Sequence, residues 1–109
     1  MEPKMYSSTK PYIKKILDVC TSHITDNDNE LLISSGNANQ TFLAYQYDCG
    51  FFIRVPIAKE MDAECNAMLD YGMSKQFVAL IRLGRDKDCD YIQLDCDGIE
   101  YSDLPTFEW

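Results

Sequence analysis

The sequence has little histidine, no paired-cysteine motif and no long apolar run. It has one histidine and five cysteines with no Cys-x-x-Cys pair, which excludes a two-histidine metal site and argues against a disulfide framework. No stretch reaches the roughly 18 apolar residues of a membrane-spanning helix, and the first residues contain no signal-peptide core. We therefore expect a cytoplasmic protein with free thiols, no metal and no membrane contact.

Cations and catalytic motifs are scarce as well. Ten lysines and arginines stand against eighteen aspartates and glutamates, for a net charge of −8 over 109 residues. Because nucleic-acid phosphates are bound through cationic contacts, we expect a basic protein partner and no direct nucleic-acid binding. The nucleophile motif Gly-x-Ser-x-Gly and the phosphate-binding motif Gly-x-x-x-x-Gly-Lys are both missing. We therefore expect neither an enzyme nor a cofactor.

Three segments carry helix signals. Each has polar or acidic residues suited to a helix start, apolar side chains spaced along one face and a glycine near the end. The segments run from Thr25 to Gly36, from Glu60 to Gly72 and from Ser74 to Gly84.

Four segments carry strand signals. Residues 16–23 and 91–96 alternate between apolar and polar side chains, and residues 41–47 and 51–55 are rich in aromatic and β-branched side chains. The latter two flank Asp48-Cys49-Gly50, which predicts a β-hairpin with a three-residue loop. The order β-α-β-β-α-α-β predicts an α+β fold with a mostly antiparallel four-stranded sheet and about three helices on one face. We expect residues 12–109 to form this single domain and residues 1–11 to be a flexible lead-in.

The last quarter of the chain concentrates negative charge. From residue 86 onward Lys87 is the only cation among eight carboxylates. Seven of these are candidate partner-binding residues: Asp86, Asp88, Asp90, Asp95, Asp97, Glu100 and Asp103. The spacing of the first three is that of a calcium loop, but its sixth position is Tyr91 where the loop needs glycine, so an acidic connection is favoured.

Aromatic side chains give a second set of candidates. Tyr45, Tyr47 and Phe52 flank the predicted hairpin turn. They fit either cross-strand packing or an outward surface that anchors a partner. The tail LPTFEW is expected to fold back onto the body and to hold the neighbouring carboxylates in a fixed array. His23 is expected to be a structural histidine that bonds near Thr21 or Thr25.

Four stretches carry a resemblance: LDVCTSHITDNDNELL, YQYDCGFFIRVP, CDYIQLDCDG and LPTFEW. Together they resemble a small family of uncharacterised bacterial domains found in plasmids and other mobile elements, often near anti-restriction genes. The resemblance brings no catalytic residues. It implies a class of small acidic proteins that inhibit host defence, which includes anti-CRISPR inhibitors and DNA-mimicking anti-restriction proteins from phages and plasmids.

These observations lead to one principal hypothesis and two alternatives. The principal hypothesis is a non-enzymatic inhibitor of a host defence nuclease, most concretely an anti-CRISPR protein that binds an RNA-guided (type II) effector. Its carboxylates would compete for lysine and arginine side chains that normally hold nucleic acid. One alternative is a regulatory or antitoxin-like interaction module of a mobile element. The other is a small enzyme or a metal-binding protein, which a calcium-dependent shift in thermal melting would support.

Overall fold

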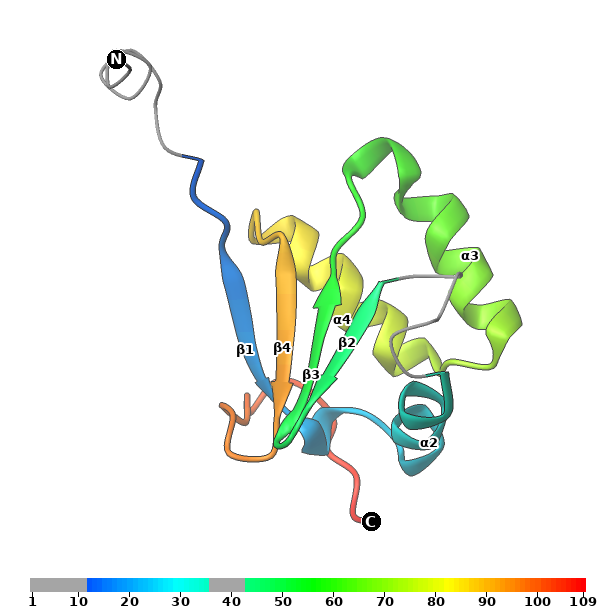
Figure 1. The fold of residues 1–109 in the computed structure, drawn as a ribbon, viewed down its shortest axis with the longest axis vertical. Helices are drawn as coiled ribbons and strands as arrows, with labels where there is room; N and C mark the ends of the chain where they lie inside the picture. Colours follow the sequence, from blue (N-terminus) through cyan, green and yellow to red (C-terminus); the bar gives the residue numbers. More distant parts are fainter. Residues whose placement is uncertain (1–11, 36–42) are drawn as a thin grey trace, which may run out of the picture.

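The computed structural model describes residues 12–35 and 43–109, which form a four-stranded sheet with three α-helices (Figure 1). In chain order the elements are β1 (Ile16–Cys20), the short 3-10 helix η1 (Thr21–His23), α2 (Asp26–Ser35), β2 (Ala44–Tyr47), β3 (Gly50–Arg54), the 3-10 helix η3 (Ala58–Glu60), α3 (Met61–Tyr71), α4 (Lys75–Asp86) and β4 (Tyr91–Asp95). The predicted α+β fold in a single domain is confirmed. The expected lead-in and the expected stop at Gly36 lie outside the described residues.

The sheet has the strand order β1-β4-β3-β2. Strand β1 pairs with β4 in parallel, and the β4–β3 and β3–β2 pairs are antiparallel. The last strand of the chain is therefore hydrogen-bonded on both sides. We call the end of the sheet where β1 and β4 begin the upper end, and the end where they finish, beside the β2–β3 turn, the lower end (Figure 1).

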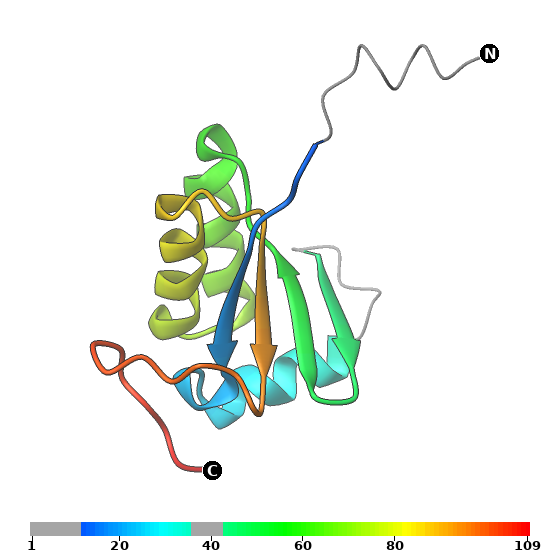
Figure 2. The same ribbon diagram turned by 90° about the vertical axis from the view of Figure 1, so that its left-hand side faces the viewer.

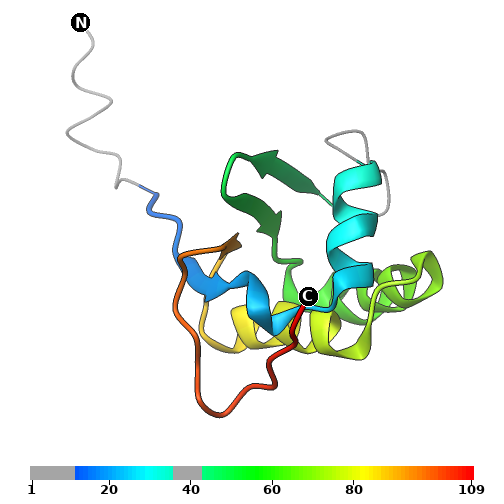
Figure 3. The same ribbon diagram turned by 90° about the horizontal axis from the view of Figure 1, so that it is seen from below.

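One face of the sheet forms the core, as the alternation in the sequence requires. Seen from below, α3 and α4 lie on one side of the sheet (Figure 3). The side chains that are buried on this face come from all four strands: Val19, Ala44, Phe51, Ile53, Ile92 and Leu94. They pack with buried residues of the helices, among them Leu32, Met68, Phe77 and Ile81.

The end of β1 and the start of β3 differ from the prediction, and β3 and β4 each end one residue earlier than predicted. Strand β1 ends at Cys20, and residues 21–23 turn into η1, where the Cys20 thiol accepts a hydrogen bond from the Ser22 amide. The β2–β3 turn has two residues instead of three, because Gly50 already pairs with Tyr47. A Cβ atom at Gly50 would lie 1.7 Å from the Leu94 carbonyl oxygen. The glycine is therefore required by the close approach of β3 to β4, and not by the turn.

Gly84 likewise has a packing role and does not end its helix. Helix α4 continues to Asp86. A Cβ atom at Gly84 would come within 2.9 Å of a Val55 methyl group and 3.3 Å of the Ile92 side chain. The missing side chain lets α4 approach β4 closely.

The buried carboxylate of Asp28 joins two helix starts. Its Oδ2 accepts hydrogen bonds from the Thr25 amide at 3.0 Å and the Ser74 hydroxyl at 2.5 Å, and its Oδ1 accepts one from the Ser74 amide at 2.8 Å. Thr25 and Ser74 in turn cap α2 and α4, accepting from the amides of Asp28 and Phe77. The predicted caps are confirmed, and the negative charge lies at the positive ends of both helix dipoles.

His23 fastens the C-terminal segment, residues 99–109, which passes the lower ends of β1 and β4 (Figure 2). The ring is 1% exposed, and its Nε2 accepts a hydrogen bond from the Tyr101 amide at 2.8 Å. Since that nitrogen is an acceptor, the proton is on Nδ1, which donates to the Pro105 carbonyl at 2.7 Å. The expected partners near Thr21 or Thr25 were therefore wrong, because the ring spans to the far end of the chain.

The predicted folding back of the tail is confirmed. The Phe107 amide donates to the Ser22 carbonyl at 2.8 Å, and the Trp109 indole donates to the Ile24 carbonyl at 3.0 Å. Leu104 packs against the core.

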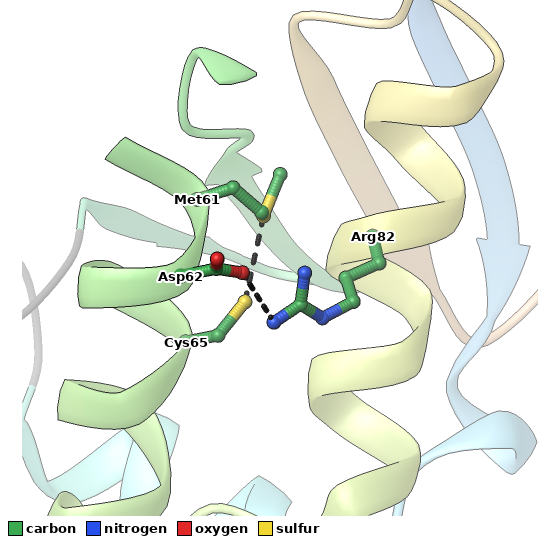
Figure 4. A network of polar contacts seen from close by, with 4 residues as sticks. All are labelled: Met61, Asp62, Cys65 and Arg82. Carbon is green, nitrogen blue, oxygen red and sulfur yellow. Dashed lines mark hydrogen bonds and ion pairs between the residues drawn. The ribbon is translucent and has the colours of Figure 1, made fainter. Parts of the chain in front are cut away.

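Helices α3 and α4 are held together mainly by apolar contacts. Arg82 of α4 reaches Asp62 of α3 at 3.1 Å (Figure 4), but both side chains are well exposed, so this ion pair contributes at most about 1 kcal/mol. Cys65 is buried against Met61, and burial raises the pKa of its thiol. Among the described residues, no helix is long and apolar enough to cross a membrane.

We expect Asp28→Ala to lower the free energy of unfolding by about 3 kcal/mol or more. The change removes three hydrogen bonds and leaves the buried amides of Thr25 and Ser74 without their acceptor. Urea denaturation measures the loss. The matched control is Asp26→Ala in the same helical turn, which should cost less than about 1 kcal/mol because Asp26 is exposed. Equal losses in the two variants would contradict the assigned role.

We expect His23→Ala to destabilise the protein by about 2–4 kcal/mol and to speed hydrogen exchange at the Tyr101 amide. Both ring partners lie in the C-terminal segment, so the segment loses its buried attachment. Ser22→Ala is the control, because it removes only the exposed bond from Ser22 to Glu100 and should cost less than about 0.5 kcal/mol. Unchanged exchange at Tyr101 in the His23 variant would disprove the attachment.

Candidate functional site

The face of the sheet opposite the core carries the three aromatic candidates. Tyr45, Tyr47 and Phe52 alternate with the buried positions of β2 and β3, and Tyr45 is 43% exposed. Tyr45 is paired with Phe52, and the ring centroids of Phe52 and Tyr47 lie 5.0 Å apart. Cross-strand packing of these rings is confirmed, and the group faces away from the core; the anchoring of a partner stays a prediction. We call Tyr45, Tyr47 and Phe52 the aromatic face.

A short chain of hydrogen bonds ties the aromatic face to β4. The Tyr47 hydroxyl accepts from the Gln93 amide at 3.0 Å and donates to Asp95 Oδ2 at 2.5 Å, and the Asp97 backbone amide donates to Asp95 Oδ1 at 2.8 Å. Gly50 stands between Tyr47 and Asp95 in the register. Because glycine has no side chain, the tyrosine can reach across β3 to the carboxylate.

The electrostatics of this pair keep each group in one protonation state. Burial, followed by the hydrogen bond to Asp95, raises the pKa of Tyr47 from 10.0 to about 12. The hydrogen bond from Tyr47, followed by that from the Asp97 amide, lowers the pKa of Asp95 below its usual 3.8. At neutral pH, Tyr47 is therefore a neutral donor and Asp95 an ionised acceptor.

The structure divides the seven predicted carboxylates between the two ends of the sheet. Asp86, Asp88 and Asp90 belong to the end of α4 and to the connection into β4, at the upper end. Two lysines lie near them: Lys87 stands between Asp86 and Asp88 in the chain, and its carbonyl accepts from the Lys15 ammonium at 3.0 Å, while Asp90 Oδ2 accepts from the Lys15 backbone amide at 3.2 Å. These three carboxylates therefore lie in a region of mixed charge.

The other four carboxylates gather at the lower end. Asp95 ends β4, and Asp97, Glu100 and Asp103 follow it in the chain. Residues 95–109 contain no lysine or arginine. Asp48, in the β2–β3 turn, joins them from the neighbouring hairpin, and because it is far from the C-terminal run in the chain, the charge pattern did not predict it. We call Asp48, Asp95, Asp97, Glu100 and Asp103 the lower acidic end.

Two thiols lie beside Asp95. Cys49 follows Asp48 in the turn, Cys96 follows Asp95, and the Cys96 amide donates to the Cys49 carbonyl at 2.9 Å. The two sulfur atoms and a carboxylate oxygen of Asp95 all lie within 4.8 Å of one another. Both cysteines are exposed, and all five cysteines of the chain are free. No local pattern indicates this cluster, since Cys49 lies more than 40 positions before Asp95 and Cys96.

A shallow pocket of about 230 Å³ opens beside the thiols. It is lined by Cys49 and Cys96, by Tyr47, by Ile33 of α2 and by Trp109 at the end of the chain. The C-terminal segment thus supplies one wall of the candidate site.

The comparisons with known proteins identify the family. The family of unknown function DUF5983, C-terminal domain, matches residues 16–109. The chain belongs to this family. Neither the curated proteins nor the solved structures yielded a match. The DUF5983 match runs from β1 to Trp109, so it covers the aromatic face, the lower acidic end and the thiols.

We expect the Tyr47→Phe variant to lose less stability than the wild type as the pH rises above 10. The pKa of Tyr47 is about 12 in the folded protein, above the usual 10.0, so its contribution to stability is complete below pH 10 and is lost as pH rises from 10 toward 12. Phenylalanine has no proton to lose. Urea denaturation at several pH values in this window should therefore give a shallower fall for the variant. Tyr45→Phe, which leaves Tyr47 in place, should keep the wild-type slope, and an identical slope in Tyr47→Phe would count against the assignment.

Proposed function

We propose that the DUF5983 domain is a non-catalytic interaction module that binds a basic protein through the aromatic face and the lower acidic end. The observation that carries the proposal is the separation of charge. Residues 95–109 carry several carboxylates and no lysine or arginine, and the candidate carboxylates among them lie at the lower end of the sheet. The candidate carboxylates at the upper end are interspersed with lysines. A basic protein surface would be attracted to the lower end, and the mixed charge at the upper end would favour one orientation of the partner.

The two components of this surface contribute in different ways. Tyrosine and phenylalanine side chains supply large contact areas and are frequent in the residues that dominate binding energy. Carboxylates make short, charge-assisted hydrogen bonds with arginine and lysine. The aromatic face and the lower acidic end meet at the bond between Tyr47 and Asp95.

The carboxylates at the lower end are held before a partner arrives. Asp95 is fixed by Tyr47 and by the Asp97 amide, and Glu100 accepts a hydrogen bond from the Ser22 hydroxyl at 2.7 Å. His23 and Trp109 fasten the segment that carries Glu100 and Asp103. Because these groups are already ordered, binding loses less conformational entropy than a mobile acidic tail would lose.

The partner class we favour is a nuclease that holds nucleic acid in a basic channel. Fixed carboxylates can occupy the places where such a channel receives phosphates. The resemblance to domains of mobile elements favours an inhibitor of a host defence nuclease, and among these an RNA-guided type II effector, whose heteroduplex lies in a positively charged channel. Such an inhibitor acts in the cytoplasm.

DNA cleavage by a panel of purified RNA-guided effectors and restriction enzymes tests this proposal. Increasing amounts of the DUF5983 domain should inhibit one enzyme class, and inhibition should weaken at higher salt. The triple variant Asp97→Asn, Glu100→Gln, Asp103→Asn should inhibit at least about tenfold less well, because it removes three charges from the lower acidic end.

The control removes the same charge from the other end of the sheet. Asp86→Asn, Asp88→Asn, Asp90→Asn should change inhibition by less than about threefold, since these residues lie among cations. Equal losses in the two triple variants would show that only net charge matters. No inhibition across the panel, together with capture of a basic toxin from the native host, would replace the nuclease inhibitor with the antitoxin-like module.

A further inference from the structure

The lower end of the sheet brings together three side chains with the ligand atoms of a metal site. The Cys49 and Cys96 sulfur atoms and a carboxylate oxygen of Asp95 lie within 4.8 Å of one another. Thiolate sulfur and carboxylate oxygen are both ligands of Zn²⁺, and two thiolates favour it over Ca²⁺ and Mg²⁺. We propose that Cys49, Asp95 and Cys96 bind one Zn²⁺ ion.

The spacing is close to what a tetrahedral ion needs. With Zn–S bonds of about 2.3 Å, two sulfur ligands stand about 3.8 Å apart, so the three side chains need to converge by no more than about 1 Å. The backbone already fixes their relative positions, because Cys96 donates to the Cys49 carbonyl and Gly50 pairs with Asp95. The remaining movement is rotation of the exposed Cys49 and Cys96 side chains.

The carboxylate has the support that metal ligands usually have. Its Oδ2 accepts from the Tyr47 hydroxyl and its Oδ1 from the Asp97 amide. A carboxylate has about four lone pairs, so these two bonds leave acceptor capacity for an ion. Hydrogen bonds of this kind orient a ligand, and their loss typically weakens metal binding by about 10–100-fold.

Binding preserves the charge of the surface. Two S–H bonds break and two Zn–S bonds form, and two protons pass to the solvent as one Zn²⁺ enters. The net charge of the lower acidic end is therefore unchanged, and the metal site does not oppose the binding of a basic partner.

Three protein ligands leave the fourth tetrahedral position for water. Cys49 and Cys96 also line the shallow pocket, together with Trp109. An exchangeable ligand therefore has a route to the ion from solvent. The sequence predicted no metal site, because it contains neither a second histidine nor a Cys-x-x-Cys pair and the ligands come from two distant turns.

Titration of the reduced 109-residue chain with Co²⁺ tests the site, because cobalt bound by thiolates gives a sulfur-to-metal charge-transfer absorption. One equivalent of Co²⁺ should produce this band, and Zn²⁺ should abolish it by displacement. Zn²⁺ should also raise the melting temperature, since an ion that binds only the folded state stabilises it.

Variants assign the ligands. Cys49→Ser and Cys96→Ser should each weaken Co²⁺ binding at least about 100-fold, and Tyr47→Phe, which keeps all three ligands, should weaken it about 10–100-fold. Cys20→Ser is the matched control, since Cys20 ends the neighbouring strand but is outside the cluster, and it should bind Co²⁺ as the wild type does. The proposal is overturned if the wild type gives no band, if Cys20→Ser loses it, or if mass spectrometry finds a Cys49–Cys96 disulfide in protein kept under reductant.

Discussion

The hydrogen bonding of β4 to a strand on each side is the constraint on which the candidate site depends. The last strand of the chain pairs with the first, β1, and with β3 of the hairpin. This register sets Asp95 beside Gly50 and Cys20 and carries the chain directly into the acidic C-terminal segment. Had β4 been an edge strand beyond β1, the hairpin turn would not meet Asp95 and Cys96 at the end of β4.

Two buried polar side chains fix segments of the chain that are not part of the sheet. Asp28 connects the starts of α2 and α4, and His23 connects η1 to the C-terminal segment. Each satisfies part-buried backbone groups, two amides for Asp28 and one amide and one carbonyl for His23, so each contributes specificity as well as stability. The lower acidic end depends on the second connection, because Glu100 and Asp103 lie on the segment that His23 fastens.

The proposed partner binding and the proposed zinc site share one small region. Asp95 is the common member: it accepts from Tyr47 of the aromatic face and lies within 4.8 Å of both thiols. The region therefore combines a surface suited to a basic protein with ligands suited to a soft cation. Exchange of Zn²⁺ for two protons leaves the electrostatic attraction intact, so the two properties are compatible.

The sequence by itself determined the element order, the caps at Thr25 and Ser74 and the acidity of the last quarter, because these follow from local periodicity, capping chemistry and composition. Only the tertiary structure decided which carboxylates lie together, since Asp86 lies before β4 and Asp95 ends it, so that the strand carries them to opposite ends of the sheet. It also decided that Gly50 serves a strand contact, that His23 bonds to residues some 80 positions away, and that Cys49 meets Cys96. The reason is that strand register and long-range hydrogen bonds arise from packing between distant segments, which a local pattern does not encode.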